Sequence, residues 1–228
     1  PPTISNITNR TINEDSNTGA VAFTIGDIDT PTTSLIPTGS SSNVVLVPDA
    51  NIVFGGSGTN RTLTVTPAAD KNGTATITVM INDGTDTVSD TFLLTVNAVN
   101  DTPVAEAQSV TLPGETAREI TLTGSDVDLN PLTFSITTMP AHGTLSGTPP
   151  MMSYLPNAGY AGPDSFAFRV NDGLLNSTAA QVSINISAVA PVITAGPTGG
   201  VFNPGAMVTL TAAYTGTNPV TYQWRKNE

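Results

Sequence analysis

The sequence predicts an all-β protein made of tandem Greek-key β-sandwich modules in an elongated array, the last of which is incomplete. Three observations support this prediction. Hydrophobic residues alternate with Thr, Ser and Asn along short segments, which is the period of a half-buried strand. The 20 Gly and 18 Pro residues are spread along the 228-residue chain, as expected for short strands joined by tight turns. The same order of strands and turns also occurs twice, about 90–100 residues apart, the size of a seven-stranded sandwich.

The repeated unit is clearest as a strand, an Asn-Asp-Gly turn and a second strand. The first copy spans residues 74–99 and turns at Asn82-Asp83-Gly84. The second copy spans residues 166–186 and turns at Asn171-Asp172-Gly173. Because successive side chains of a strand point to opposite faces, each copy gathers its hydrophobic residues on one face. Both copies are therefore expected to contribute a hairpin to a sandwich.

Further strands are expected on either side of these hairpins. The pattern predicts strands over residues 21–25, 118–123 and 132–136, and two irregular strands within residues 38–60. The segment Gly55-Gly56-Ser57-Gly58 lacks the lysine and helix of a phosphate-binding loop, so it is expected to form a hairpin turn. The modules are then expected to span residues 1–101, 102–189 and 190–228.

The third module contains only part of a sandwich. Alternating hydrophobic residues predict strands at Val208, Leu210, Ala212 and Tyr214, and then at Val220, Tyr222 and Trp224. A half-sandwich leaves an unpaired edge and an open core, which is not stable by itself. Either the chain is truncated here or another chain supplies the missing strands. The start at Pro1 without a Met also favours an internal piece of a longer protein.

Charge and composition exclude several classes of function. The net charge of −11 comes from 18 acidic and 7 basic residues, which disfavours nucleic acids and anionic membrane surfaces as partners. The chain has no Cys, so thiolate metal sites and disulfides are absent. No apolar run approaches the ~18 residues of a membrane span, so membrane insertion is not expected. An acidic surface of this kind attracts divalent cations.

The sequence also lacks the residues of a catalytic site, so the chain is not expected to be an enzyme. His142 is the only histidine, and it lies in a Pro-Ala-His-Gly turn where a structural role is expected. Paired carboxylates are used by glycosidases, which also need an aromatic-lined cleft. The aromatic content of 5% does not supply one.

Several motifs resemble known bacterial families. Residues 125–136 (Ser-Asp-Val-Asp-Leu-Asn-Pro-Leu-Thr-Phe-Ser-Ile), 140–145 and 162–166 resemble bacterial cadherin-like tandem repeats. Residues 11–15 (Thr-Ile-Asn-Glu-Asp) and 96–101 resemble a sister group of these repeats. The segment ending Val-Thr-Tyr-Gln-Trp-Arg-Lys-Asn is similar to bacterial immunoglobulin-like domains, where Trp224 would pack in the core and Leu210 would occupy the place of a disulfide.

The resemblance to cadherins implies calcium at the joint between the first two modules. Ca²⁺ takes six to eight oxygen ligands, and loops at one pole of a sandwich converge in space. The expected ligands are Glu14, Asp15, Asp70, Asn100, Asp101, Asp126 and Asp128. A further set comprises Asp27 and Asp29, which would face a preceding module, together with Asn130 and Asp172. The alternative is that these side chains only cap turns, which is favoured for Asp83 and Asp172.

The second joint lacks the acidic linker. Residues 96–103 contain Asn-Asp-Thr-Pro, whereas residues 186–191 run Ile-Ser-Ala-Val-Ala-Pro. Glu115 and Asp164 are expected near this pole, but the linker oxygens are missing. No calcium is therefore predicted there, and Pro191 with a short hydrophobic linker is expected to set the angle.

These observations favour an extracellular or cell-surface role. The leading hypothesis is a rod-like spacer or adhesion segment of a large bacterial surface or secreted protein, with calcium stiffening the first joint. Its partners would be neighbouring modules of the same chain, together with homotypic or surface-glycan or protein contacts. One alternative is an accessory spacer of a secreted hydrolase. Another is a filament subunit whose third module is completed by a strand from a neighbouring subunit.

Overall fold

The computed structural model describes residues 1–196, 203–221 and 223. It divides the chain into two compact units, Pro1–Asn100 and Asp101–Glu228. The boundary lies one residue before the expected end of the first module. Residues 190–228 belong to the second unit, and their status as a separate module stays a prediction. Among the described residues, no helix is long and apolar enough to cross a membrane.

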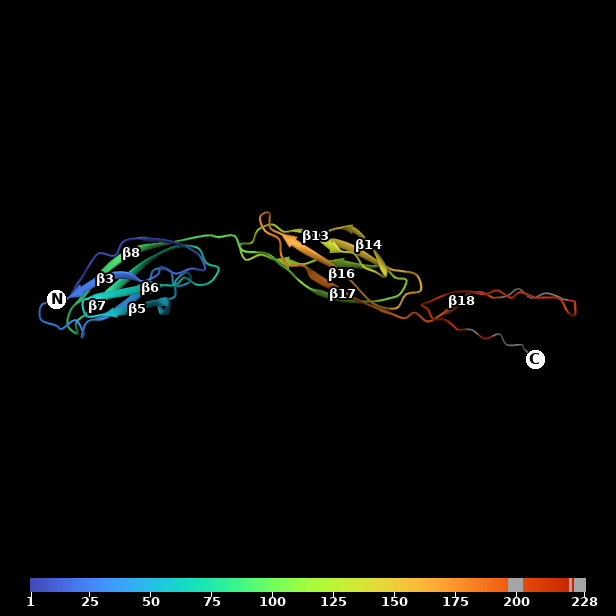
Figure 1. The fold of residues 1–228 in the computed structure, drawn as a ribbon, viewed down its shortest axis with the longest axis horizontal. Helices are drawn as coiled ribbons and strands as arrows, with labels where there is room; N and C mark the ends of the chain where they lie inside the picture. The colour runs from blue at the N-terminus through green and yellow to red at the C-terminus, as the bar shows by residue number, and fades with distance from the viewer. Residues whose placement is uncertain (197–202, 222, 224–228) are drawn as a thin grey trace. The chain divides into compact units, whose positions relative to one another are not determined.

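The first unit is a sandwich of two four-stranded sheets, ordered β2-β8-β7-β4 and β1-β3-β6-β5 (Figure 1). Strand β2 pairs with β8 in parallel, and the other neighbours are antiparallel. The elements are β1 (Thr3–Ile4), β2 (Arg10–Asn13), β3 (Val21–Gly26), β4 (Ile36–Ser41), a 3₁₀ helix (Asp49–Asn51), β5 (Ile52–Ser57), β6 (Asn60–Val65), β7 (Gly73–Asn82) and β8 (Thr87–Asn97).

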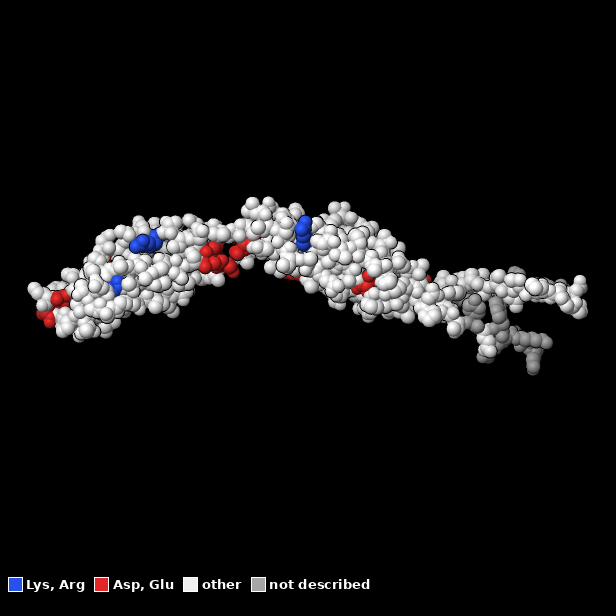
Figure 2. Space-filling view, viewed as in Figure 1, with Lys and Arg blue, Asp and Glu red and all other residues white. Residues whose placement is uncertain are grey.

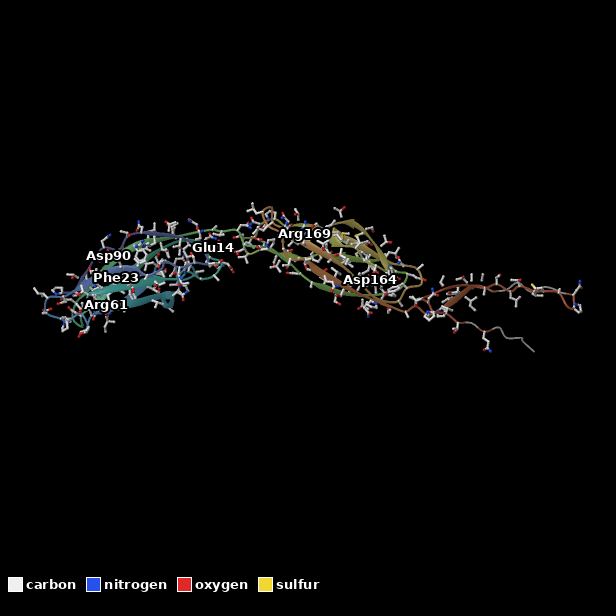
Figure 3. All side chains as sticks on the ribbon, viewed as in Figure 1. Glu14, Phe23, Arg61, Asp90, Asp164 and Arg169 are labelled. Atoms are coloured by element: carbon white, nitrogen blue, oxygen red, sulfur yellow. The ribbon has the colours of Figure 1, made fainter. Side chains whose placement is uncertain are left out.

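The core of the first unit follows the period-two pattern. On β7, Ile77, Val79 and Ile81 are fully buried, and they alternate with Thr78 and Met80 on the other face, which are only partly buried. Phe23 of β3, labelled in Figure 3, packs edge-on against Phe54 of β5, with ring centroids 6.3 Å apart. The two sheets therefore enclose one continuous hydrophobic core.

The second unit contains a four-stranded sheet, β10-β17-β16-β13, and a three-stranded sheet, β11-β15-β14. Short strands β12 and β9 pair separately, as do β18 and β19. Strand β10 runs parallel to β17. The strands are β9 (Val104–Ala105), β10 (Gln108–Pro113), β11 (Arg118–Thr121), β12 (Gly124–Ser125), β13 (Thr133–Thr138), β14 (Gly143–Thr148), β15 (Met151–Pro156), β16 (Gly162–Asn171), β17 (Ala180–Ser187), β18 (Val192–Ala195) and β19 (Ala213–Thr215).

Tyr154 is the largest fully buried side chain of the second core. It packs with Phe166 and Phe168 of β16, which alternate inward as the sequence predicts. Gly143 lies directly under the Tyr154 ring, and a Cβ at position 143 would collide with the ring atoms. The glycine of the Pro-Ala-His-Gly turn is therefore required by space, because the phenol ring occupies the place of a side chain.

The predicted fold class is confirmed by this all-β architecture. The expected hairpin at Gly55–Gly58 is also confirmed, because β5 pairs with β6 as far as Ser57 and Asn60. The strand predicted around Val208, Leu210 and Ala212 is not formed. Within this segment only Ala213–Thr215 joins a sheet, pairing with Val192–Ala195.

The expected core position of Leu210 is also wrong in this structure, because Leu210 is 45% exposed. A strand forms only where a neighbour satisfies its backbone groups, and residues 206–212 gain no such neighbour among the described residues. Tyr222 and Trp224 lie outside the described residues, so the predicted core role of Trp224 stays a prediction.

Candidate cation sites in the polar loops of the two units

The loop that follows β12 in the second unit carries the Asp126-Val127-Asp128 pair. Asp126 Oδ1 accepts a hydrogen bond from the Asn130 backbone N–H at 3.2 Å, and the Asp126 carbonyl accepts one from Leu129 N–H at 3.2 Å. In contrast, Asp126 Oδ2 is shielded from solvent and accepts no hydrogen bond among the described residues. Leaving a buried carboxylate oxygen unpaired is costly. A bound cation would remove that cost.

Leu129 adds strain to the same loop. Its φ is +61°, the left-handed region that a bulky non-glycine residue rarely adopts. Its side chain is 87% exposed, so no packing of the leucine itself explains this conformation. Such a conformation persists only where the surrounding structure imposes it. Here it holds the loop in a shape in which Asn130 N–H reaches Asp126.

Asp101 and Asp128 lie close together at the start of the second unit. The Asp101 backbone N–H donates to Asp128 Oδ2 at 2.8 Å, and the two side chains offer carboxylate oxygens within 4.8 Å of each other. Both residues are partly buried. Two carboxylates at this distance repel each other unless a cation or proton neutralises one of them. This part of the predicted ligand set is therefore brought together within one unit.

The first unit contains an equivalent pair, Asp27-Ile28-Asp29, in the loop after β3. Asp27 Oδ1 accepts hydrogen bonds from Asp29 N–H at 2.9 Å and Thr30 N–H at 3.1 Å. Asp27 Oδ2 is buried and accepts no hydrogen bond among the described residues, although the Pro1 ammonium lies 3.7 Å away. The first aspartate of both pairs therefore has one oxygen capped by the turn and one that lacks a hydrogen bond.

The two carboxyls of this pair also affect each other's ionisation. A hydrogen bond shared between the Asp27 and Asp29 side chains lowers the pKa of Asp27 and raises the pKa of Asp29. Asp27 is therefore held as the carboxylate, while Asp29 retains its proton more readily than usual. Carboxylates this close favour a shared proton or a shared cation.

Glu14, which follows β2, is a buried acid at the opposite pole of the first unit. The residue is 5% exposed, and its Oε1 accepts a hydrogen bond from Val99 N–H at 2.6 Å. The Glu14 N–H in turn donates to the Asn97 carbonyl at 3.0 Å. Glu14 therefore fastens the segment that leaves β8 toward Asn100, the last residue of the unit.

Asp15 and Asp70 lie together at this same pole. Asp15 Oδ1 accepts a hydrogen bond from Asp70 N–H at 3.1 Å, and the two carboxylates have oxygens within 4.8 Å of each other. Both residues are in the left-handed region, with φ of +58° and +54°, which Asp tolerates better than most residues. In Figure 2, Asp and Glu residues gather at this end of the first unit, where Figure 3 labels Glu14.

The remaining predicted residues have smaller roles in the geometry. Asn130 contributes its backbone N–H to Asp126. Asp172 is 9% exposed, and its Oδ1 accepts hydrogen bonds from Leu174 and Leu175 N–H at 2.7 and 2.6 Å. Asp83 makes the equivalent bonds to Thr85 and Asp86 N–H. Oδ1 of both acids is thus used in an Asx-type turn, as expected from the alternative in which these side chains cap turns and do not bind calcium.

Sequence reasoning placed Asp164 near the second joint but missed its role. Its Oδ1 accepts from Ala141 and Ser165 N–H at 3.0 and 2.8 Å, and its Oδ2 from His142 N–H and Tyr154 O–H at 2.9 and 2.7 Å. Burial opposes ionisation, but these hydrogen bonds outweigh it and lower the pKa of Asp164. Burial, and then the hydrogen bond to Asp164, raises the pKa of Tyr154. Figure 3 labels Asp164 in the second unit.

Asp90 of β8 was also missed. Its Oδ2 accepts a hydrogen bond from Ile7 N–H at 2.6 Å, and this bond ties the segment between β1 and β2 to the sheet (Figure 3). Ile7 itself is 3% exposed and belongs to the first core. The only sequence signal for this role is an acid at an outward position of a strand, which is too common to be informative.

Comparison with known proteins agrees with this fold. Residues 100–185 match the family model described as a bacterial Ig domain. No curated protein matches the chain. The ectodomain of human desmocollin-1 is 10% identical with a TM-score of 0.55, over 85% of this chain and 42% of desmocollin-1.

Other solved structures are less similar in their geometry. Human protocadherin-24 EC1-2 is 16% identical with a TM-score of 0.46, over 82% of this chain and 98% of that chain. An endo-fucoidan hydrolase of glycoside hydrolase family 107 is 22% identical with a TM-score of 0.37, over 83% of this chain and 29% of the hydrolase. The chain thus spans less than half of the hydrolase and of desmocollin-1. Its fold is that of cadherin-like and immunoglobulin-like β-sandwiches, and residues 100–185, less than half of the chain, are similar to the bacterial Ig domain family.

Proposed function

We propose that the chain is a rod-like spacer or adhesion segment of a bacterial surface or secreted protein, and that Ca²⁺ stiffens the joint around Asn100 and Asp101. The observation that carries this proposal is Asp126, the first aspartate of the Asp-X-Asp pair in the second unit. Its buried Oδ2 accepts no hydrogen bond among the described residues, which is the arrangement that a hard cation would complete.

Covalent continuity supports the role of the joint. Glu14, Asp15 and Asp70 lie at the pole of the first unit from which the chain leaves after β8. Asp101, Asp126 and Asp128 lie at the pole of the second unit at which the chain enters. In the proposal, Asn100 and Asp101 bring the two acidic sets to one ion. The ion would then limit rotation at the linker, and a stiff linker is what a spacer needs.

Extracellular placement follows from the same chemistry. Extracellular calcium modules typically have a Kd of about 10⁻⁴–10⁻³ M, which suits the calcium concentration outside a cell. The net charge of −11 favours cation binding and keeps a surface protein soluble. No group of this chain is proposed to catalyse a reaction. Adhesion would use neighbouring modules, a second copy, or glycans or proteins of another surface.

The test is a thermal melt of the whole chain in 10 mM CaCl₂ (about 100 times a Kd of ~10⁻⁴ M) and in EDTA. At this ratio, binding stabilises the native state by about 2.7 kcal/mol, which raises Tm by roughly 10 °C for a domain of this size. The variant Asp126→Asn/Asp128→Asn should lose most of this shift. Isothermal titration calorimetry should show the same loss of calcium binding.

The matched control is Asp86→Asn/Glu119→Gln, which removes the same charge from two exposed positions. It should keep the full calcium shift, because neither side chain belongs to a candidate site. A parent chain whose Tm and calorimetric trace do not respond to Ca²⁺ would refute the proposed mechanism. An equal loss in the control and in the Asp126/Asp128 variant would show only a general effect of charge.

A further inference from the structure

A loop of the C-terminal segment is docked on the second sandwich at the end of β17. The Thr217 backbone N–H donates to the Val189 carbonyl at 3.1 Å, and Asn218 N–H donates to the Gly159 carbonyl at 2.8 Å. The Thr217 hydroxyl accepts from Val189 N–H at 3.0 Å and donates back to the Val189 carbonyl at 3.3 Å. Thr217 is 6% exposed, so these contacts exclude water from the hydroxyl.

Two glycines of the sandwich leave the space for this loop. A Cβ at Gly114 would lie 2.7 Å from Thr217 Cγ2 and 3.2 Å from the Tyr160 carbonyl oxygen. The φ of Gly114 is not in the left-handed region, so it is the contact with Thr217 that requires a glycine. A Cβ at Gly159 would lie 2.7 Å from Asn218 Nδ2. We call the surface formed by Gly114, Gly159 and Val189 the glycine notch.

The notch is held in place by the sandwich itself. Gly114 N–H donates to the Ser187 carbonyl at 3.0 Å. The Tyr160 hydroxyl donates to the Pro163 carbonyl at 2.8 Å, and the Tyr160 ring stacks on His142, with centroids 4.1 Å apart. His142 N–H is bound by Asp164. Because both sides of the notch are fixed by hydrogen bonds and stacking, docking requires little reorganisation of the sandwich.

The polar contacts between the notch and the Thr217–Asn218 turn are all between neutral groups among the described residues. Backbone amides, carbonyls and one hydroxyl satisfy each other, and no carboxylate takes part. We infer that the glycine notch is a docking site for the Thr217–Asn218 turn, and that it fixes this turn to the second sandwich without a metal ion. This inference concerns a different joint from the proposed calcium site and does not depend on it.

The experiment is amide hydrogen exchange by NMR on the whole chain, in CaCl₂ and in EDTA. The amides of Val189, Thr217 and Asn218 should be protected, and equally so in both buffers. The variant Gly114→Ala places a methyl group against Thr217 Cγ2, so exchange of these amides should become about tenfold faster or more. The control Gly196→Ala should change nothing, because a Cβ there meets no atom within 4 Å.

A compensating variant makes the test specific. Thr217→Ser removes Cγ2 and keeps the hydroxyl, so Gly114→Ala/Thr217→Ser should recover protection to within about threefold of the parent. Thr217→Val alters only the docked loop and keeps its shape. It removes the hydroxyl that Val189 N–H binds, and exchange at Val189 should become about tenfold faster.

Three outcomes would overturn the inference. The first is unprotected exchange of Val189, Thr217 and Asn218 in the parent chain. The second is protection that disappears in EDTA. The third is a double variant no better protected than Gly114→Ala, together with unchanged exchange in Thr217→Val. Exchange of the β16 amides shows whether the sandwich itself remains folded. If Gly114→Ala disturbs the fold, the result for Thr217→Val tests the inference instead. Failure of the calcium proposal would leave all these results unchanged.

Discussion

Asp164→Ala should be among the most destabilising single substitutions at a polar residue of the second unit. The carboxylate accepts hydrogen bonds from Ala141, His142 and Ser165 N–H and from the Tyr154 hydroxyl. It therefore connects the turn before β14 to the start of β16 and to the centre of the core. Alanine at this position removes the acceptor for all these donors at once.

The loss of folding free energy depends on whether each donor can hydrogen-bond to water once the carboxylate is removed. Tyr154 is fully buried, so its hydroxyl loses the hydrogen bond to Asp164 at a cost of about 2 kcal/mol. Ala141 and His142 lie at the surface, and each lost bond from their amides to the charged group costs about 1 kcal/mol after hydration. The sum over Tyr154, Ala141 and His142 is about 4 kcal/mol, a large share of the ~5–15 kcal/mol typical of a domain.

A double-mutant cycle separates the tyrosine from the turn. Tyr154→Phe alone should cost about 1.5 kcal/mol, because Asp164 keeps its backbone donors. Tyr154→Phe/Asp164→Ala no longer buries an unpaired hydroxyl, so it should be less destabilised than the sum of the single variants by about 2 kcal/mol. Native-state hydrogen exchange of β16 and β17 amides in the whole chain measures the free energy of unfolding of this unit.

Glu119→Ala is the control, because Glu119 is an exposed acid of the same unit and its loss should cost under about 0.5 kcal/mol. The reasoning fails if Asp164→Ala costs less than about 1 kcal/mol, or if the two single variants add without coupling. Additivity would mean that the bond between Tyr154 and Asp164 contributes nothing in solution.

Two further predictions concern acids that accept backbone hydrogen bonds. Because the folded pKa of Asp164 is lowered, its ionised form stabilises the unit fully above the unfolded pKa of about 3.9. This stability should be lost as pH falls from about 4 through the lower folded pKa, and acid titration of amide exchange in β16, compared with Asp164→Asn, measures it. Asp90→Ala should lower the free energy of unfolding by about 1–2 kcal/mol, because Ile7 N–H loses its 2.6 Å hydrogen bond to the carboxylate. Hydrogen exchange of the Ile7 amide should become faster. Unchanged exchange at Ile7 would show that this hydrogen bond does not stabilise the unit.

The sandwich strands are largely predictable from sequence because one face of each is buried. Alternation alone locates β7, β8, β16 and β17, and Asn-Asp-Gly marks both hairpin turns, where Asn82 and Asn171 Oδ1 cap the glycine N–H. Alternation carries no information on strand direction, so the parallel pairs β2–β8 and β10–β17 could not be foreseen. It also misleads over residues 208–212, where a hydrophobic pattern exists but no neighbouring strand pairs with it among the described residues.

The candidate sites are predictable only in part. The Asp-X-Asp pairs and the acids near Asn100 are visible as a pattern, but the pattern does not show which oxygens stay without a partner. That property depends on burial and on amides brought in by folding. The donors to Asp164 include Ala141 and Tyr154, which lie 23 and 10 residues away in the chain. No local motif signals that this aspartate would be fully hydrogen-bonded.

The contrast between Asp164 and Asp126 gives a physical criterion for the cation sites. Both are partly buried aspartates of the second unit, Asp126 in the loop after β12 and Asp164 near the start of β16. Each oxygen of Asp164 accepts two hydrogen bonds, so a cation would have to displace protein donors in order to bind. Asp126 Oδ2 has no such donor among the described residues, so a cation would add a partner where the protein supplies none. By this criterion we expect the joint with the neutral glycine notch to need no calcium, and we expect the acidic loop after β12 to gain stability from it. An acid is therefore a good ligand candidate here because of the hydrogen bonds it lacks, and the number of acids nearby is a poorer guide.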